Sequence, residues 1–125
     1  MVREKLPERR RNVTWKAKAG GCKLHFTVGY YEDGRPGEVF VDAGKLGSAV
    51  SMWAHSSAML LSLLLQHGVS IEEVSALFKG FSIGIGIELH PTIHGAANII
   101  DFVLKAIMEH SNGSADRLGT EQLTT

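Results

Sequence analysis

The chain has 125 residues, 13 basic and 13 acidic side chains, and 44% hydrophobic residues. This length suits one domain that can form a hydrophobic core without cross-links. The zero formal net charge argues against a general nucleic-acid-binding protein, and a single cysteine, Cys22, excludes an intrachain disulfide. Because we recognise no signal peptide or lipidation motif at the N-terminus, we expect a soluble, cytoplasmic protein.

The first segment, residues 1–12 (MVREKLPERRRN), is polar and basic. We interpret it as a basic N-terminal arm, either a solvated tail or a strap that grips a neighbour or an anionic ligand. The folded domain is expected to follow over residues 13–112.

From residue 13 onward, apolar and polar residues alternate with the period of two that is typical of half-buried strands. Gly20 and Gly21 mark one turn, and EDGRPG at residues 32–37 marks a second. The pattern therefore predicts a three-stranded antiparallel meander. Its strands are expected over residues 13–18, 22–31 and 38–44.

Residues 48–67 (SAVSMWAHSSAMLLSLLLQH) contain no Lys, Arg, Asp or Glu, and their apolar side chains cover most of a helical circumference. Ser48 offers an N-cap and Gly68 a stop signal. A helix that is apolar all round must be buried on all sides, so we expect this to be the central helix of the fold. A transmembrane span is the alternative. The polar residues inside the window, and the lack of a Lys/Arg cluster at its C-terminal end, argue against it.

Two further helices are predicted. Ser70 and Glu73 form an S-x-x-E capping box before a short amphipathic helix that ends at Gly80. Residues 81–91 are expected to be extended, as a strand or, preferably, as a loop packed against the sheet edge. Residues 92–110 form the third helix, and residues 113–125 lack periodicity and are expected to be a disordered tail. The fold class is α+β, with the meander packed on a central buried helix plus two helices.

Four segments follow one another in a distinctive order: LPERRRNVTWKAKAGG, GYYEDGRPGEVFVDAGKLGSA, LLLQHGVSIEEV and ANIIDFVLKAIM. In order and spacing they resemble the C-terminal TSCPD domain of adenosylcobalamin-dependent ribonucleotide reductases, over residues 3–110. The most specific pieces are R-R-x-x-x-x-x-K-A, YEDGRPGEVFVD and QHGVSIEEV. The resemblance implies an accessory domain that occurs as a stand-alone small protein.

This chain departs from the family in three respects. The motif for which the TSCPD domain is named is absent, and HPTIHGAAN stands in its place. Reductase chemistry of the family's kind needs a thiyl-forming cysteine and a reducing cysteine pair, and Cys22 alone cannot supply all three. The barrel that holds substrate and cobalamin in the family is also missing. The resemblance therefore does not imply a complete reductase.

Other catalytic or metal-binding patterns are weak. His90 and His94 flank Pro91, so they are not a helical metal-binding pair, and no second cysteine accompanies them. Ser56 follows His55 directly in the predicted helix, where adjacent side chains point to different faces. No G-x-S-x-G motif occurs. We therefore expect no enzyme activity, no metal site and no cofactor.

Ligand binding is the remaining function. An arginine guanidinium group can donate two hydrogen bonds to phosphate oxygens, an aromatic ring can stack on a base, and the N-terminus of a helix attracts anions. The candidate ligand-binding residues are Arg9, Arg10, Arg11, Trp15, Lys16, Lys18, Arg35, Lys45 and Ser48. The alternative for each of these residues is a solvated rim of charge.

Self-association is also expected, because Trp53 and residues 60–65 provide more apolar surface than a small sheet and two short helices can cover. The first functional hypothesis is a homo-oligomeric, non-catalytic module that regulates or sequesters a small phosphorylated, nucleotide-type ligand. The alternative is a split accessory subunit of an adenosylcobalamin-dependent ribonucleotide reductase, with the large catalytic chain as its partner. Neither hypothesis involves a membrane or a long nucleic acid.

Overall fold

The computed structural model describes residues 2–19, 21–45, 47–79, 85–88, 93, 95–96, 98–111 and 119–124. The elements, in chain order, are β1 (Arg10–Ala19), β2 (Cys22–Tyr30), β3 (Pro36–Ala43), α1 (Ala49–Gln66), α2 (Ile71–Ala76), β4 (Ile85–Glu88), β5 (Gly95–Ala96), α3 (Ile99–Ser111) and β6 (Gly119–Thr124). The predicted α+β class is confirmed. His90 and His94 lie outside the described residues.

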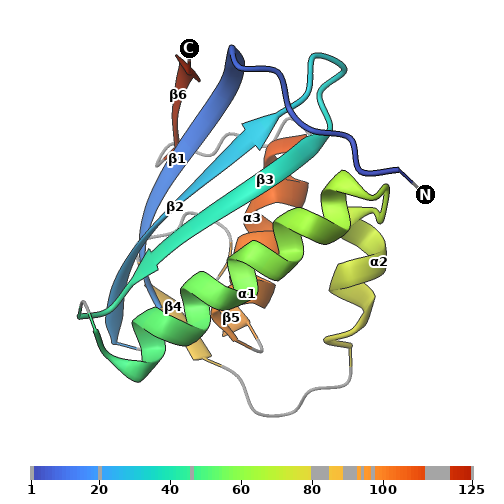
Figure 1. Cartoon of the computed structure of the whole chain (residues 1–125). Helices are drawn as coiled ribbons and strands as arrows, with labels where there is room; N and C mark the ends of the chain where they lie inside the picture. The colour runs from blue at the N-terminus through green and yellow to red at the C-terminus, as the bar shows by residue number, and fades with distance from the viewer. Residues whose placement is uncertain are drawn as a thin grey trace.

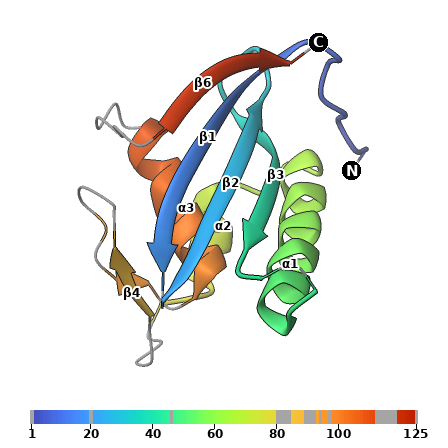
Figure 2. The same ribbon diagram turned by 90° about the vertical axis from the view of Figure 1, so that its left-hand side faces the viewer.

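The sheet is built on the predicted meander. Strands β3, β2 and β1 pair antiparallel in that order, and both β4 and β6 pair with the remaining edge of β1. Strand β6 pairs with Arg10–Trp15 and β4 with Lys18–Ala19, so the two strands occupy successive parts of one edge (Figure 2). The helices α1, α2 and α3 lie on one side of the meander or at its edge (Figure 1).

Three boundaries differ from the sequence predictions. Residues 119–124 form β6 where a disordered tail was expected, because backbone pairing with an open strand edge needs no side-chain periodicity. Residues 85–88 form a strand rather than a loop for the same reason. The third helix begins at Ile99, not at residue 92, since the Asn98 side chain accepts a hydrogen bond from the Asp101 N–H (2.9 Å) and caps it.

The centre of the core is α3 rather than α1. Phe102, Val103, Leu104, Ala106 and Ile107 of α3 are all fully buried. They pack against the inner face of the meander, where Phe26 meets Phe102 edge-on with ring centroids 5.6 Å apart. The sequence analysis expected α1 to be the central helix, and this prediction was wrong.

Helix α1 lies beside the edge strand β3 and is only half buried. Its N-cap is Ser48, and Gly68 follows its C-terminal end with φ of 89°, both as predicted. The side chains that it buries are mainly small or aliphatic: Ala54, Ala58, Leu61, Leu65 and Gln66. Its opposite face is exposed, so it is not buried on all sides. Among the described residues it is the one helix long and apolar enough to cross a membrane, which is weak evidence for a span.

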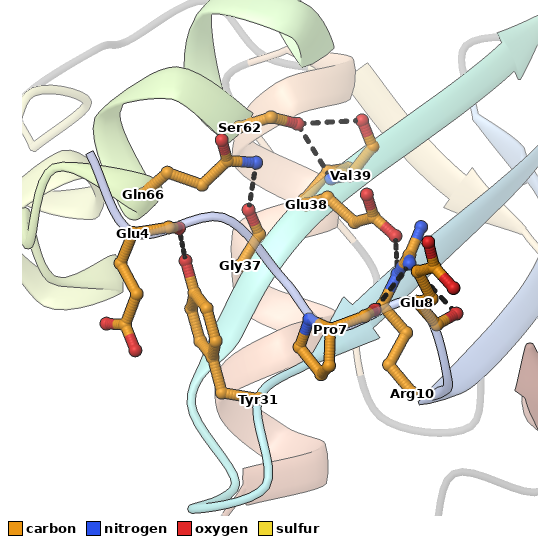
Figure 3. A network of polar contacts seen from close by, with 10 residues as sticks. All are labelled: Glu4, Pro7, Glu8, Arg10, Tyr31, Gly37, Glu38, Val39, Ser62 and Gln66. Atoms are coloured by element: carbon orange, nitrogen blue, oxygen red, sulfur yellow. Dashed lines mark hydrogen bonds and ion pairs between the residues drawn. The ribbon is translucent and has the colours of Figure 1, made fainter.

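Polar side chains of α1 satisfy the open edge of β3 (Figure 3). The Ser62 Oγ accepts a hydrogen bond from the Val39 N–H (2.8 Å) and also bonds to the Val39 carbonyl oxygen (3.1 Å). The Gln66 Nε2 donates to the Gly37 carbonyl oxygen (2.9 Å). The helix thus takes the place of a further strand and protects this edge from pairing with another chain.

Candidate ligand-binding site

Trp15 is not available to a ligand. Its side chain is fully buried on the inner face of β1, where its ring stacks on Phe26 with centroids 5.0 Å apart. The edge of the His110 ring contacts it from α3 at 5.5 Å. The sequence interpretation of Trp15 as a base-stacking residue is therefore wrong, because strand alternation places Val13, Trp15 and Ala17 of β1 in the core.

Of the three candidate arginines near the N-terminus, Arg10 and Arg11 are engaged within the protein. Arg10 forms an ion pair with Glu38 and donates to the Pro7 carbonyl oxygen at 2.8 Å (Figure 3). The Arg11 guanidinium lies 5.0 Å above the Tyr30 ring. Arg9 is exposed on the arm. The three arginines therefore do not converge on one anion site.

Arg35, at the β2–β3 turn, is engaged in the same way. It pairs with Asp33 (2.7 Å) and Glu4 (3.0 Å), and its guanidinium lies 4.7 Å above the Tyr31 ring. Hydrogen bonds from the Arg35 backbone and side chain lower the pKa of the Asp33 carboxyl group. Arg35 therefore orders the turn rather than offering a phosphate site.

The N-terminal arm is a strap on its own domain. The Glu4 N–H donates to the Gln66 carbonyl oxygen (2.8 Å), and the Arg3 Nε donates to the Gln66 Oε1 (2.6 Å). The Tyr31 hydroxyl donates to the Glu4 carbonyl oxygen (Figure 3). Residues 10–12, which were assigned to the arm, are the first residues of β1. The arm thus ties the end of α1 to the β2–β3 turn.

This strap predicts a loss of stability in alkali. Burial, and then the charge of Glu4, raises the pKa of the Tyr31 phenol. The folded state therefore favours the neutral phenol, and its contribution to the free energy of unfolding is present below about pH 10 and lost as the pH rises through the raised pKa. We expect absorbance at 295 nm to show Tyr31 ionising later than a free tyrosine. Tyr31→Phe removes that signal and flattens the alkaline slope of stability; an equal slope in both proteins would contradict the assignment.

Lys45 and Ser48 lie at the other end of β3 from Arg10. The Ser48 Oγ accepts from the Ser51 N–H (3.2 Å), so the hydroxyl group is used as the N-cap of α1. Lys45 is exposed in the β3–α1 connection. These two residues therefore do not form one cluster with the arginines of the arm.

The outer face of the sheet, which is turned toward the viewer in Figure 2, brings together residues that the sequence analysis did not combine. Cross-strand pairing aligns Lys16, His25 and Asp42 in one row, and Thr14, Thr27 and Phe40 in the next. The hydroxyl groups of Thr14 and Thr27 are 3.0 Å apart. Side chains in such rows stand about 5 Å from their cross-strand neighbours, so one small molecule can contact both rows. Lys18 follows on β1, opposite Lys23 of β2.

A depression of about 700 Å³ opens between this outer face and the N-terminal half of α1. Its walls include Thr14, His25, Thr27, Phe40, Asp42, Gly47, Ser51, Met52 and His55. A second groove of about 470 Å³ runs on between β3 and α1, and Phe40 and His55 line both. Phe40 is 53% exposed and lies at the junction of the two.

The chemistry of this depression suits a planar, polar ligand. The Phe40 ring offers a stacking surface, His25 a donor and Asp42 an acceptor, and Lys16 stands beside His25 on the same sheet face. Phe40 could have been found from the sequence. It occupies an outward position of the alternating strand EVFVD, where a polar residue is expected.

Residues 2–111 match the TSCPD domain family. The chain belongs to that family. It is 38% identical over 107 residues to a vitamin B12-dependent ribonucleotide reductase of Bradyrhizobium diazoefficiens, an alignment that covers 84% of this chain and 8% of the reductase. The corresponding protein of Agrobacterium fabrum is 39% identical over the same shares, and that of Rhodopirellula baltica is 32% identical over 82% of this chain and 10% of the reductase.

No solved structure matches this TSCPD domain. The chain spans about a tenth of the length of the curated relatives just named. The resemblance to the reductase TSCPD domain that was seen in the sequence is thus confirmed. These 125 residues do not contain the rest of such a reductase.

Proposed function

We propose that this TSCPD domain is a non-catalytic binding module that regulates or sequesters a small phosphorylated, nucleotide-type ligand. The ligand occupies the depression between the outer sheet face and α1. The observation that carries the proposal is Phe40, an aromatic ring that is half exposed where two adjoining grooves meet. The relatives are named as ribonucleotide reductases, which supports a ligand of the nucleotide class.

Phe40 would hold the base. Every nucleobase has a π-face, and stacking on an aromatic side chain contributes about 1–3 kcal/mol per base. The hydroxyl groups of Thr14 and Thr27 lie beside Phe40 in its row and can bond to the base or sugar. This position replaces Trp15 as the stacking residue.

The phosphate would lie over the neighbouring row. Lys16 and His25 are exposed cross-strand neighbours, and Gly47 and Ser51 bring the N-terminal end of α1 to the same depression. A lysine and a histidine N–H beside a helix N-terminus suit a phosphate group. Asp42, which pairs with His25 across the strands, can accept hydrogen bonds from ribose hydroxyl groups.

The cysteine count supports a non-catalytic role. The chain has one cysteine, Cys22, which lies at the start of β2 and is partly exposed. Ribonucleotide reduction that uses a thiyl radical and a dithiol would need three thiol groups. The chain's own side chains therefore cannot complete that reduction, which favours binding without turnover.

The test is isothermal titration calorimetry of the full chain with mono-, di- and cyclic nucleotides, supported by native mass spectrometry. We expect stoichiometric binding that Phe40→Ala weakens about 5- to 150-fold, because loss of one stack is worth about 1–3 kcal/mol. Lys16→Gln should weaken the binding of nucleoside phosphates but leave the binding of the nucleoside unchanged.

Leu77→Ala serves as the matched control, since Leu77 is an exposed apolar residue after α2 and outside the depression. Arg35→Gln tests whether Arg35, a candidate from the sequence, contributes to phosphate binding. The proposal fails if no nucleotide binds, or if Phe40→Ala binds as tightly as the unchanged chain.

A further inference from the structure

Helix α1 carries an apolar surface that no other part of the described chain covers. We call it the α1 stripe. It consists of Val50, Met52, Trp53, Met59, Leu60, Leu63 and Leu64, each between 41% and 74% exposed. Trp53 is the most exposed of them. Apolar patches on monomeric proteins seldom exceed a few hundred Å², and larger ones mark interaction sites.

We propose that the α1 stripe is the interface between two copies of this chain. From their exposed fractions, the seven side chains present roughly 700 Å², close to the ~800 Å² that each partner contributes to a standard protein interface. The stripe thus has about the area that a stable dimer needs. This inference rests on α1 alone and does not depend on the proposed ligand.

The absence of charge favours a second copy over other occupants. From residue 48 to residue 67 the sequence has no Lys, Arg, Asp or Glu. A two-fold interface sets a surface against itself, so any charge near its axis meets a like charge, and an uncharged stripe avoids that repulsion. A helix that binds a bilayer surface usually carries Lys or Arg on its polar face, and α1 carries neither.

The spacing along the stripe suits packing of one helix on another. Trp53 and Leu60 are seven residues apart, and Ser56 and Leu63 repeat that interval three residues later. This 3–4 alternation is the pattern by which side chains of two helices interlock. Ser56, near the middle, is small and permits close approach. Trp53, an aromatic anchor of the kind that dominates interface energies, lies beside a groove between α1 and α3 that can receive a partner side chain.

The stripe also borders the ligand depression. Met52 lines that depression, and Met59 and Leu63 line the adjoining groove between β3 and α1. A second copy on the stripe would therefore stand next to the mouth of both hollows. Dimer formation is measured without nucleotide. A chain that does not dimerise can therefore be told apart from a chain that does not bind nucleotide.

The experiment is sedimentation velocity of the full chain from low micromolar to several hundred micromolar concentration. We expect a dimer whose dissociation constant rises about 100-fold in Leu60→Glu, because two glutamates would be buried at the two-fold axis. Trp53→Ala should raise it by a smaller factor. Both positions are exposed in one copy, so circular dichroism should show an unchanged fold.

Leu77→Glu is the matched control. Leu77 is 68% exposed against 65% for Leu60, but it follows α2 and is not part of the stripe. That variant should dimerise as the unchanged chain does. The proposal is overturned if the chain is monomeric throughout, or if the dimer survives Leu60→Glu. A monomer that floats with phosphatidylcholine vesicles would overturn it too and would assign the stripe to a bilayer.

Discussion

Trp15→Ala is expected to lower the free energy of unfolding by about 3–5 kcal/mol, the range found when a large aromatic residue is removed from a core. The Trp15 ring is fully buried, stacks on Phe26 and meets His110 of α3 edge-on. Its loss leaves a cavity between the meander and the most buried helix. Urea denaturation followed by circular dichroism measures the change.

The control for Trp15→Ala is its neighbour in the same strand. Lys16 points to the outer face, so Lys16→Ala should change stability by less than about 0.5 kcal/mol. Trp15→Phe keeps a ring in the stack, so its free energy of unfolding should lie between those of Trp15→Ala and Lys16→Ala. A Trp15→Ala protein that keeps its stability but no longer binds nucleotide would restore the ligand-binding role that the sequence suggested.

Gln66→Leu is expected to cost about 2–3 kcal/mol, because it removes two hydrogen bonds and leaves a buried carbonyl oxygen without its donor. The Gln66 side chain is buried between the Gly37 carbonyl oxygen at 2.9 Å and the Arg3 Nε at 2.6 Å. The substitution should also loosen the N-terminal strap. Urea denaturation measures the stability, and the rate of trypsin cleavage in the arm measures the loosening.

Ser56→Ala is the companion variant, since Ser56 belongs to the same helix but lies on its exposed face. It should change neither stability nor the rate of cleavage in the arm. If Gln66→Leu is as stable as Ser56→Ala, the contacts of Gln66 do not hold the strap. If stability falls but cleavage does not accelerate, the strap is held by Glu4 and Tyr31 instead.

The meander and the helix caps could be predicted because they depend on neighbouring residues. Alternation places Val13, Phe26 and Val41 on the inner face, and all three are buried. Ser70 caps α2 as expected, with the Glu73 N–H donating to the Ser70 Oγ at 3.1 Å. The same alternation, applied to residue 15, would have placed the tryptophan in the core rather than in a ligand site.

The candidate site could be predicted only in part. Lys16, which the sequence analysis named, does lie on the face that carries the depression, whereas Arg10 and Arg35 are engaged in ion pairs within the protein. Phe40 and His55 become neighbours because α1 folds back along β3. This packing of α1 against β3 is a tertiary contact, and no local sequence pattern specifies it.

The sequence by itself determined the α+β class, the meander, the half-buried character of its three strands and the start of α1 at Ser48. These features follow from hydrophobic periodicity and from hydrogen bonds within a few residues. Only the tertiary structure decided that α3 rather than α1 fills the core, that Arg10 meets Glu38, 28 residues away, and that the α1 stripe stays exposed. Each of those outcomes depends on which distant surfaces meet, because an apolar helix has the same local pattern whether it is covered by its own chain or by another.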